Sequence, residues 1–206
     1  MLIVVEHPLC LHDVAIVRDR RSDRATFRRA MHRIGLHVCL AATQHLPTQQ
    51  TNIETPLEEA TCSIVARPIV AVAILRAGLM LLEPMLELAP GARVGYLGLR
   101  RDEATLQPEQ YYRRLPPLDE HSSVVLLDPM VATGGSAAAA VEVLLESGAR
   151  DITLACVLAA PEGIARLSAS YPALRIVTAV IDRELDQRGY IRPGLGDAGD
   201  RAFGTE

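Results

Sequence analysis

Short apolar runs alternate with amphipathic stretches from residue 69 to residue 181. The apolar runs predict strands at 69–75, 93–99, 123–128, 152–158 and 175–181. The stretches between them predict helices at about 78–88, 135–146 and 162–170. Strands that alternate with helices form a mainly parallel sheet covered on both faces. We therefore predict an α/β fold with a mainly parallel sheet flanked by helices.

A long helix is predicted before this region, from about residue 23 to residue 46. Ser22 is the expected N-cap, and Pro47 ends the helical pattern. Apolar residues recur at steps of four and three along one stripe: Phe27, Met31, Ile34, Val38 and Ala41. Leu36 and Leu40 widen this stripe, so either the protein's own core or a neighbouring subunit covers the second side.

The remaining segments predict appendages to one domain that spans residues 1–206. Residues 51–55 and 60–66 indicate a hairpin. Residues 110–115 are predicted to be extended, and together with the charged stretch before them they are expected to form a flap that spans residues 100–115 approximately. The tail from about 182 to 206 is rich in glycine and polar residues, so we expect a lobe that carries part of a site.

Composition excludes several classes of protein. The chain has 206 residues, 49% hydrophobic and 22% charged, with a net charge of −4. The longest apolar runs fall short of the roughly 20 residues that span a bilayer, and no long basic block indicates nucleic-acid binding. We expect a cytoplasmic protein that binds neither membrane nor nucleic acid. Four scattered cysteines predict no disulfide, and the arginines of 18–33 are interpreted as a solvated helix face.

The segment 124–136 carries the most informative pattern. An apolar strand leads to Asp128, then to a Thr-Gly-Gly-Ser turn, and an alanine-rich helix follows. Backbone N–H groups at Gly134 and Gly135 can approach an anion closely because no Cβ intervenes. The N-terminus of the next helix adds unpaired donors and a partial positive charge. Thr133 and Ser136 add hydroxyl donors, so the turn suits a phosphate monoester.

The surrounding residues narrow the kind of phosphate ligand. No lysine follows the glycines, as a Walker A loop requires, and no G-x-G-x-x-G fingerprint is present. Asp128 stands at the strand end, where a carboxylate can accept hydrogen bonds from sugar hydroxyls. The pattern therefore favours a ribose phosphate. A tight strand-to-helix connection that binds nothing is the alternative reading of the same residues.

At these residues the chain resembles the uracil phosphoribosyltransferases, which have the type I phosphoribosyltransferase fold. The resemblance covers nearly the whole chain, and its later motifs are specific to the uracil enzymes. The matching segments are 74–78 (Ile-Leu-Arg-Ala-Gly), 101–108 (Arg-Asp-Glu-Ala-Thr-Leu-Gln-Pro), 128–136 (Asp-Pro-Met-Val-Ala-Thr-Gly-Gly-Ser), 159–163 (Ala-Ala-Pro-Glu-Gly) and 189–200 (Gly-Tyr-Ile-Arg-Pro-Gly-Leu-Gly-Asp-Ala-Gly-Asp).

The resemblance implies a glycosyltransferase that makes UMP and pyrophosphate from uracil and phosphoribosyl pyrophosphate, in pyrimidine salvage. Arg76 would hold the pyrophosphate, and Arg101 of the flap would reach it as charge develops, because a guanidinium binds phosphate oxygens in a fork. The resemblance makes Arg101 and Asp197 the catalytic residues. Without the resemblance, a salt bridge at Arg76 and a solvated Arg101 are equally good readings. The residues implied to bind phosphoribosyl pyrophosphate are Arg76, Arg101, Asp128, Pro129, Met130, Val131, Ala132, Thr133, Gly134, Gly135, Ser136 and Asp197.

The same resemblance makes 182–206 the family's uracil-binding hood. The backbone of Ile191, Gly196, Asp197 and Ala198 would match the acceptor–donor–acceptor edge of uracil. Asp197 would assist deprotonation at N1 or order the ribose and metal, and the sequence leaves this choice open. Tyr190 either walls the pocket or belongs to the core.

Family members also imply partners for the reaction. Pro129 stands where many phosphoribosyltransferases have a second acid, so Mg²⁺ would bind mainly through substrate oxygens and water, with no ligand set made by the protein alone.

A GTP effector and a homodimer or higher homo-oligomer are family properties. Arg100 precedes the flap arginine and shares or competes for its role. Two rival hypotheses are a transferase for another base and a regulator that binds RNA, which the acidic balance disfavours.

Overall fold

The computed structural model describes the backbone of residues 1–101 and 108–205, and the side chains of these residues except 100, 101 and 108. The elements run β1 (Leu2–Val4), α1 (Pro8–Arg18), α2 (Arg24–Thr43), β2 (Thr48–Glu54), β3 (Glu59–Val65), β4 (Ile69–Leu75), α3 (Leu79–Leu88), β5 (Arg93–Arg101), β6 (Pro108–Arg114), β7 (Ser123–Leu127), β8 (Met130–Val131), α4 (Gly135–Glu146), β9 (Asp151–Ala159), α5 (Pro161–Ser170), β10 (Arg175–Ile181), β11 (Glu184–Leu185), β12 (Ile191–Arg192) and α6 (Ala198–Phe203).

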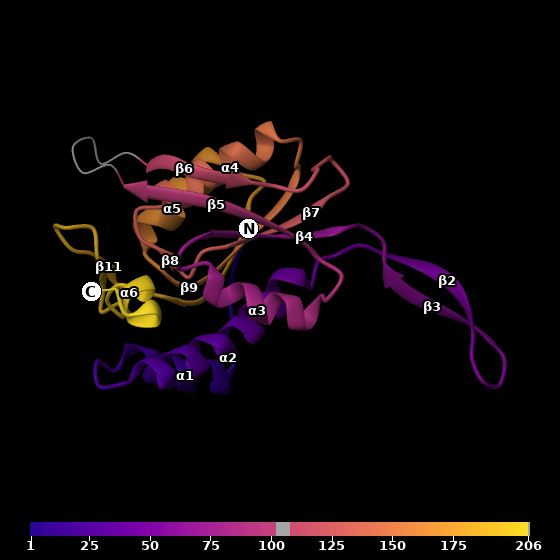
Figure 1. Ribbon diagram of the computed structural model, residues 1–206, viewed down its shortest axis with the longest axis horizontal. Coiled ribbons are helices and arrows are strands. Elements are labelled where there is room, and N and C mark those ends of the chain that lie inside the picture. Colours follow the sequence, from indigo (N-terminus) through magenta and orange to yellow (C-terminus); the bar gives the residue numbers. More distant parts are fainter. Residues whose placement is uncertain (102–107, 206) are drawn as a thin grey trace.

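The central sheet has the strand order β1-β10-β9-β7-β4-β5-β6, and β8 pairs with the end of β9. Every pairing is parallel except that of β5 with β6. Helices α1, α2 and α3 cover one face, and α4 and α5 cover the other (Figure 1). The predicted α/β fold with a mainly parallel sheet flanked by helices is confirmed.

Burial on both faces explains why the central strands are apolar without interruption. In β7, Val124 and Leu126 belong to the core under α4, whereas Val125 and Leu127 belong to the core under α2. Successive side chains of a strand point to opposite faces, so both sets must be apolar when both faces are covered. The predicted bounds of β4, α4 and β10 agree with the structure.

Helix α2 differs from its prediction at both ends. Its N-cap is Asp23, which accepts a hydrogen bond from the Thr26 N–H at 2.7 Å, while the Ser22 hydroxyl donates to the Ile16 carbonyl. The helix ends at Thr43 rather than near residue 46. The stripe residue Met31 is buried, but Leu40 is 60% exposed, so the core of this chain does not cover the second side.

The arginines of 18–33 are not a uniformly solvated face, which corrects the sequence interpretation. Arg33 pairs with the buried carboxylate of Asp13 on α1, a helix that the sequence pattern did not predict. Arg18 and Arg28 bond to residues beyond 180. Arg21 and Arg29 do lie on the surface. Three of the seven arginines in this run, Arg18, Arg28 and Arg33, therefore join segments that are distant in the sequence.

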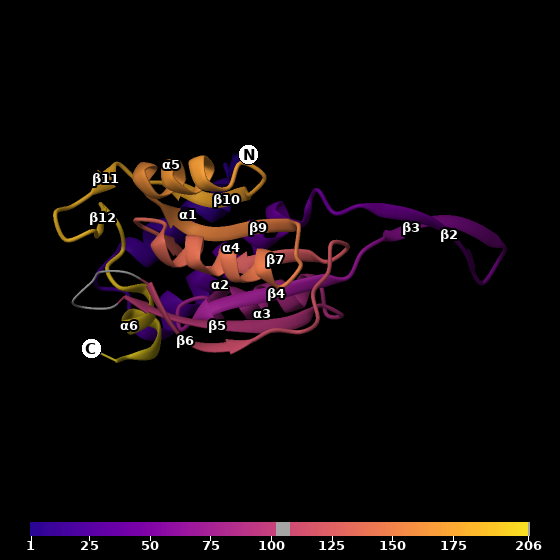
Figure 2. The same ribbon diagram turned by 90° about the horizontal axis from the view of Figure 1, so that it is seen from above.

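The β2–β3 hairpin extends from the body of the molecule as an arm (Figures 1 and 2). Its strands pair only with each other within the described residues, with Thr48 opposite Val65 and Glu54 opposite Glu59. Residues from 182 onward lie at the other end of the molecule, beside α1 and beyond the carboxyl ends of the central strands. None of the described helices is long and apolar enough to cross a membrane.

Candidate active site

A cavity of about 610 Å³ opens at the carboxyl ends of the central strands. One wall is Asp128 and the continuous segment 130–137, which leads from β8 into α4. The opposite wall consists of 188–191 and 196–199, in the region that we call the hood (182–206). Open α/β sheets bind ligands at this edge of the sheet. The structure thus brings together two segments separated by about sixty residues.

The turn before α4 has the geometry that the sequence predicted. Gly134 has φ 72°, the left-handed conformation that glycine adopts without steric cost. The first hydrogen bond of α4 runs from the Ala138 N–H to the Gly134 carbonyl at 2.9 Å. The N–H groups of the first turn consequently remain available to an anion. Gly135 N–H makes a long contact of 3.4 Å with Thr133 Oγ1.

Asp128 follows β7 and is only 9% exposed. Burial raises the pKa of its carboxyl from 3.8 to about 7, and a long contact of 3.5 Å from the Met130 N–H opposes this only weakly. A carboxylate in such a place gains stability when hydroxyl groups of a ligand donate to it. Asp128 can therefore act as an acceptor for sugar hydroxyls at the wall of the cavity.

Arg76 follows β4 but does not line the cavity, although its neighbour Ala77 does. Its guanidinium donates to Asp200 Oδ1 at 3.2 Å and to Thr205 Oγ1 at 2.9 Å, and the peptide bond that precedes it is cis. The backbone of Arg101 ends β5, but its side chain lies outside the described residues. The same holds for the side chain of Arg100 and for the flap residues 102–107.

In the hood, Asp197 is the N-cap residue of α6. Oδ1 of Asp197 caps this helix by accepting from the Asp200 N–H at 2.8 Å, and Oδ2 has no hydrogen bond to the described residues. Gly196 has φ 83°, and a Cβ at this residue would stand 3.7 Å from the Arg201 side chain. Ile191 and Ala198 are buried, and both line the cavity.

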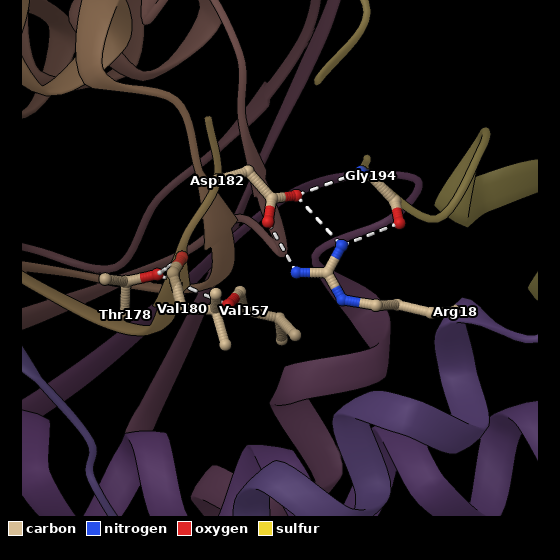
Figure 3. A network of polar contacts seen from close by, with 6 residues as sticks. All are labelled: Arg18, Val157, Thr178, Val180, Asp182 and Gly194. Atoms are coloured by element: carbon tan, nitrogen blue, oxygen red, sulfur yellow. Dashed lines mark hydrogen bonds and ion pairs between the residues drawn. The ribbon is translucent and has the colours of Figure 1, made fainter. Parts of the chain in front are cut away.

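A buried ion pair fastens the hood to α1. Arg18 forms two hydrogen bonds to the carboxylate of Asp182, which also accepts from the Gly194 N–H at 3.0 Å (Figure 3). Arg18 further donates to the Gly194 carbonyl at 2.9 Å. Because Asp182 directly follows β10, this network joins the hood, the sheet and α1. Thr178 lies nearby and donates to the carbonyl of Val180.

Arg201 forms a second attachment from α6. Its guanidinium donates to the carbonyls of Asp19 at 2.8 Å, of Leu195 at 2.8 Å and of Val17, and lies 4.4 Å from the centre of the Phe27 ring. On the same helix the Ala202 carbonyl accepts from Arg28 at 2.6 Å. Several bonds to α1 and α2 therefore fix the position of Asp197.

Most of the candidate site residues meet in this cavity. Lining residues among them are Asp128, Met130, Val131, Ala132, Thr133, Gly134, Gly135, Ser136, Ile191, Gly196, Asp197 and Ala198. Pro129 is not among them, and its carbonyl accepts hydrogen bonds from the N–H groups of Val157 and Leu158. Tyr190 lines the cavity and is 55% exposed, so it is not a core residue.

Sequence reasoning missed Arg166 and Arg188, which also line the cavity. Arg166 is on α5, a helix to which the sequence analysis gave no part in the site. Arg188 precedes Gly189 in the turn between β11 and β12. The only sequence signal for these two site residues is a basic side chain near a glycine-rich segment. This combination is common on protein surfaces, so it does not indicate a site.

Solved structures place this fold among the phosphoribosyltransferases. A hypoxanthine phosphoribosyltransferase from Staphylococcus aureus matches with a TM-score of 0.51 at 12% identity, over 82% of this chain and 86% of that one, which shows the fold alone. The AQ2163 protein of Aquifex aeolicus matches with a TM-score of 0.95 at 34% identity, over 100% of this chain and 99% of the other. The fold is therefore that of the phosphoribosyltransferases, with a cavity at the edge of the sheet where open α/β sheets bind ligands.

Sequence comparisons identify the branch. The family model described as uracil phosphoribosyltransferase matches residues 4–205. The uracil phosphoribosyltransferase of Dictyoglomus thermophilum is 45% identical over 207 residues, with 100% of both chains covered. That of Acidovorax ebreus is 46% identical over 204 residues, with 98% of each covered. The chain belongs to the uracil phosphoribosyltransferase family, whose members are pentosyltransferases.

Proposed function

We propose that the cavity is the active site in which uracil displaces pyrophosphate from C1 of phosphoribosyl pyrophosphate, giving UMP. The whole chain, residues 1–206, acts as one catalytic domain in this proposal. One observation carries it: the phosphate-type turn before α4, the buried Asp128 and the hood carboxylate of Asp197 line the same cavity. A phosphorylated ribose and a flat base fit between these two walls.

The turn 133–136 would hold the 5′-phosphate. Free N–H groups at the start of α4 and the partial positive charge of the helix end favour a dianion there. Asp128, on the same wall of the cavity, would accept hydrogen bonds from the ribose hydroxyls. Together these contacts fix the sugar so that C1 faces the hood, which removes most of the orientational freedom of the reaction.

The leaving group requires cations because charge accumulates on pyrophosphate as its bond to C1 breaks. We assign this role to Arg76 and Arg101, whose guanidinium groups stay protonated and bind phosphate oxygens in a fork. Arg76 is held by Asp200 and Thr205 at the edge of the cavity, at 51% side-chain exposure. Contacts that strengthen as charge develops lower the barrier rather than tightening ground-state binding.

Uracil would bind to the backbone of the hood. Its acceptor–donor–acceptor edge would pair with backbone N–H and C=O groups of Ile191, Gly196 and Ala198, three residues that line the cavity. Asp197 would accept the N1 proton, since its Oδ2 is free of other bonds to the described residues. Proton removal at N1 makes the nitrogen a better nucleophile for C1.

Magnesium is the expected cofactor, and the donor set suits an ion held through the substrate. Among the described residues no group of three or more His, Cys, Asp or Glu side chains is placed to hold a metal ion. Asp128 and Asp197 are the carboxylates that line the cavity. They would hold a hydrated ion together with substrate oxygens, as Mg²⁺ prefers. When bound, the ion neutralises charge on the leaving pyrophosphate.

Turnover with a panel of bases tests the proposed specificity. Formation of the nucleoside 5′-monophosphate of each base, together with release of pyrophosphate, is measured with uracil, cytosine, hypoxanthine and orotate at equal concentrations, with phosphoribosyl pyrophosphate and magnesium. Product with uracil and at most a few per cent of that rate with the others supports the proposal. A faster reaction with another base assigns a different substrate, and no reaction with any base, together with RNA binding that weakens with salt, supports the regulator hypothesis.

We further propose that the chain acts as a homo-oligomer. Two observations favour this: Leu9 and Leu40 are exposed on neighbouring helices α1 and α2, and the β2–β3 arm exposes Ile53 and Val65. A two-stranded hairpin without further partners is only marginally stable in water, so a second copy would stabilise the arm. Light scattering should give at least twice the mass of one chain.

Two other expectations remain predictions from the sequence. Binding of a GTP effector rests on the family resemblance. A cytoplasmic location agrees with the four free cysteines, Cys10, Cys39, Cys62 and Cys156, which suit a reducing compartment. Titration with GTP during turnover would test the first, and cell fractionation the second.

A further inference from the structure

Helix α5 lies unusually close to the turn before α4. A Cβ added to Gly163 would stand 2.3 Å from the Ala132 carbonyl oxygen, and one added to Gly134 would stand 3.0 Å from the Gly163 carbonyl oxygen. Side chains would prevent both approaches, so two glycines make this packing possible. Leu167, which is fully buried, fills the space beside Gly134. The first turns of α5 are therefore fixed against the phosphate-type turn.

This packing determines where Arg166 lies. Arg166 is three residues after Gly163, and residues at this spacing share one face of a helix. Its Nη1 is 3.6 Å from the position that a Cβ on Gly135 would occupy, and Thr133 Oγ1 is 3.5 Å from the same position. The guanidinium and the Thr133 hydroxyl thus flank the residue that begins α4. Both side chains line the cavity.

The guanidinium has no competing partner within the described part of the chain. No hydrogen bond or ion pair involves Arg166 there, in contrast to Arg18, Arg33 and Arg175. Burial raises the pKa of the Tyr171 hydroxyl; the charge of Glu142 on α4 also raises this pKa, whereas the charge of Arg166 lowers it. These two charges form no ion pair within 4 Å. An arginine that is free and next to open backbone donors is available to an anion.

We propose that Arg166 is a phosphate-binding residue that holds the 5′-phosphate of the ribose from the side of α5. The inference rests on the proposed function for the identity of the ligand, and on geometry for the residue. The phosphate would then be held between the N–H groups of α4 and a guanidinium, which forms stronger, charge-assisted hydrogen bonds. Arg166 would bind substrate and product alike, because this phosphate does not change in the reaction.

Uniform binding of this kind has a definite kinetic signature. Loss of Arg166 should raise KM for phosphoribosyl pyrophosphate about ten-fold and leave kcat within about two-fold, because ground state and transition state lose the same contact. Affinity for UMP should fall by the same factor. KM for uracil should not change. A residue that only supported the fold would lower kcat and the melting temperature as well.

The direct test is calorimetric binding of ribose 5-phosphate and of pyrophosphate to the whole chain. Arg166→Gln should weaken ribose 5-phosphate binding about ten-fold and reduce its dependence on salt, and Arg166→Lys should recover part of the loss. Pyrophosphate binding should stay unchanged in both variants. Arg67→Gln is the matched control, since Arg67 is exposed and precedes β4, at the opposite end of the strand from the cavity.

Equal ribose 5-phosphate affinities in wild type and Arg166→Gln would overturn the inference, and so would a wild type that does not bind this ligand. The measurement needs no turnover, so it stands apart from the proposed function. A wild type that binds ribose 5-phosphate through Arg166 but does not use uracil would refute the function alone. If the wild type converts uracil and Arg166→Gln binds ribose 5-phosphate as tightly as the wild type, only the role of Arg166 is refuted.

Discussion

The guanidinium of Arg76 is hydrogen-bonded to the carboxylate of Asp200, with 3.2 Å between Nη2 and Oδ1. This pair links the segment after β4 to helix α6 of the hood, and Thr205 completes it by bonding to both partners. The arginine that we assign to the leaving group is thus bonded to the helix that follows the Asp197 wall of the cavity. Both side chains are partly exposed, so the pair contributes little to stability.

Arg76→Ala should therefore separate binding from folding. We expect the melting temperature to change by less than about 2 °C, because a solvated ion pair is lost. Pyrophosphate affinity should fall by about ten-fold or more, while ribose 5-phosphate still binds. Calorimetric titration of both ligands measures this. Unchanged pyrophosphate binding would remove Arg76 from the leaving-group site.

Arg18→Ala should have the opposite profile, because its partner Asp182 has a side-chain exposure of only 3%. An unpaired buried carboxylate is costly, and we expect the free energy of unfolding to fall by about 2–3 kcal/mol. KM for uracil should rise, since this pair fastens the hood. Urea denaturation measures the stability of the variant.

Arg21→Ala is the matched control for this experiment. Arg21 also pairs with an aspartate, Asp19, but its side chain is 85% exposed. Its urea midpoint should equal that of the wild type. Equal destabilisation by the two substitutions would show that burial of Asp182 is not the reason for the stability of the tether.

Asp128 should make stability depend on pH in a direction unusual for an aspartate. The folded chain holds the proton up to a pKa of about 7, whereas the unfolded chain releases it near 3.8. The folded state therefore binds more protons between these values, and stability falls as the pH rises from about 4 to about 7. The loss is on the order of 4 kcal/mol at most.

Comparison of the wild type with Asp128→Asn isolates this contribution. The variant carries no proton to release at this position. The free energy of unfolding of the variant minus that of the wild type should therefore increase as the pH rises through this window. Urea denaturation at pH 5, 6, 7 and 8 gives the difference. A difference that is constant over the series would mean that the carboxyl of Asp128 is already ionised in the folded protein.

Much of the sheet and one wall of the site were predictable from local patterns. The continuous apolar runs of β4 and β7 require a doubly covered sheet, and a Thr-Gly-Gly-Ser turn at a strand end indicates a phosphate site. These features depend on neighbours in the sequence. The bounds of α4 agreed because Gly134 and Gly148 mark both of its ends.

Features that depend on distant partners were not predictable. Arg18 and Arg28 have the same sequence surroundings as the solvated Arg21 and Arg29, and only the position of the hood distinguishes them. Helix α1 was also missed, and neither its length nor its initial proline distinguishes it from α5, which was predicted. Arg166 reaches the site through the packing of α5 on α4, which the helical pattern of either segment does not contain. Tertiary contacts, rather than local propensity, decide each of these cases.

Release of pyrophosphate tests the account most directly, with wild type compared with Asp197→Asn in the presence of phosphoribosyl pyrophosphate and magnesium. Asparagine caps a helix as well as aspartate does, so α6 should remain formed and the melting temperature should stay within about 2 °C. We predict release that requires uracil in the wild type and is about a hundred-fold slower in the variant. Release at the wild-type rate by Asp197→Asn, or none from the folded wild type with uracil, would contradict the proposed active site.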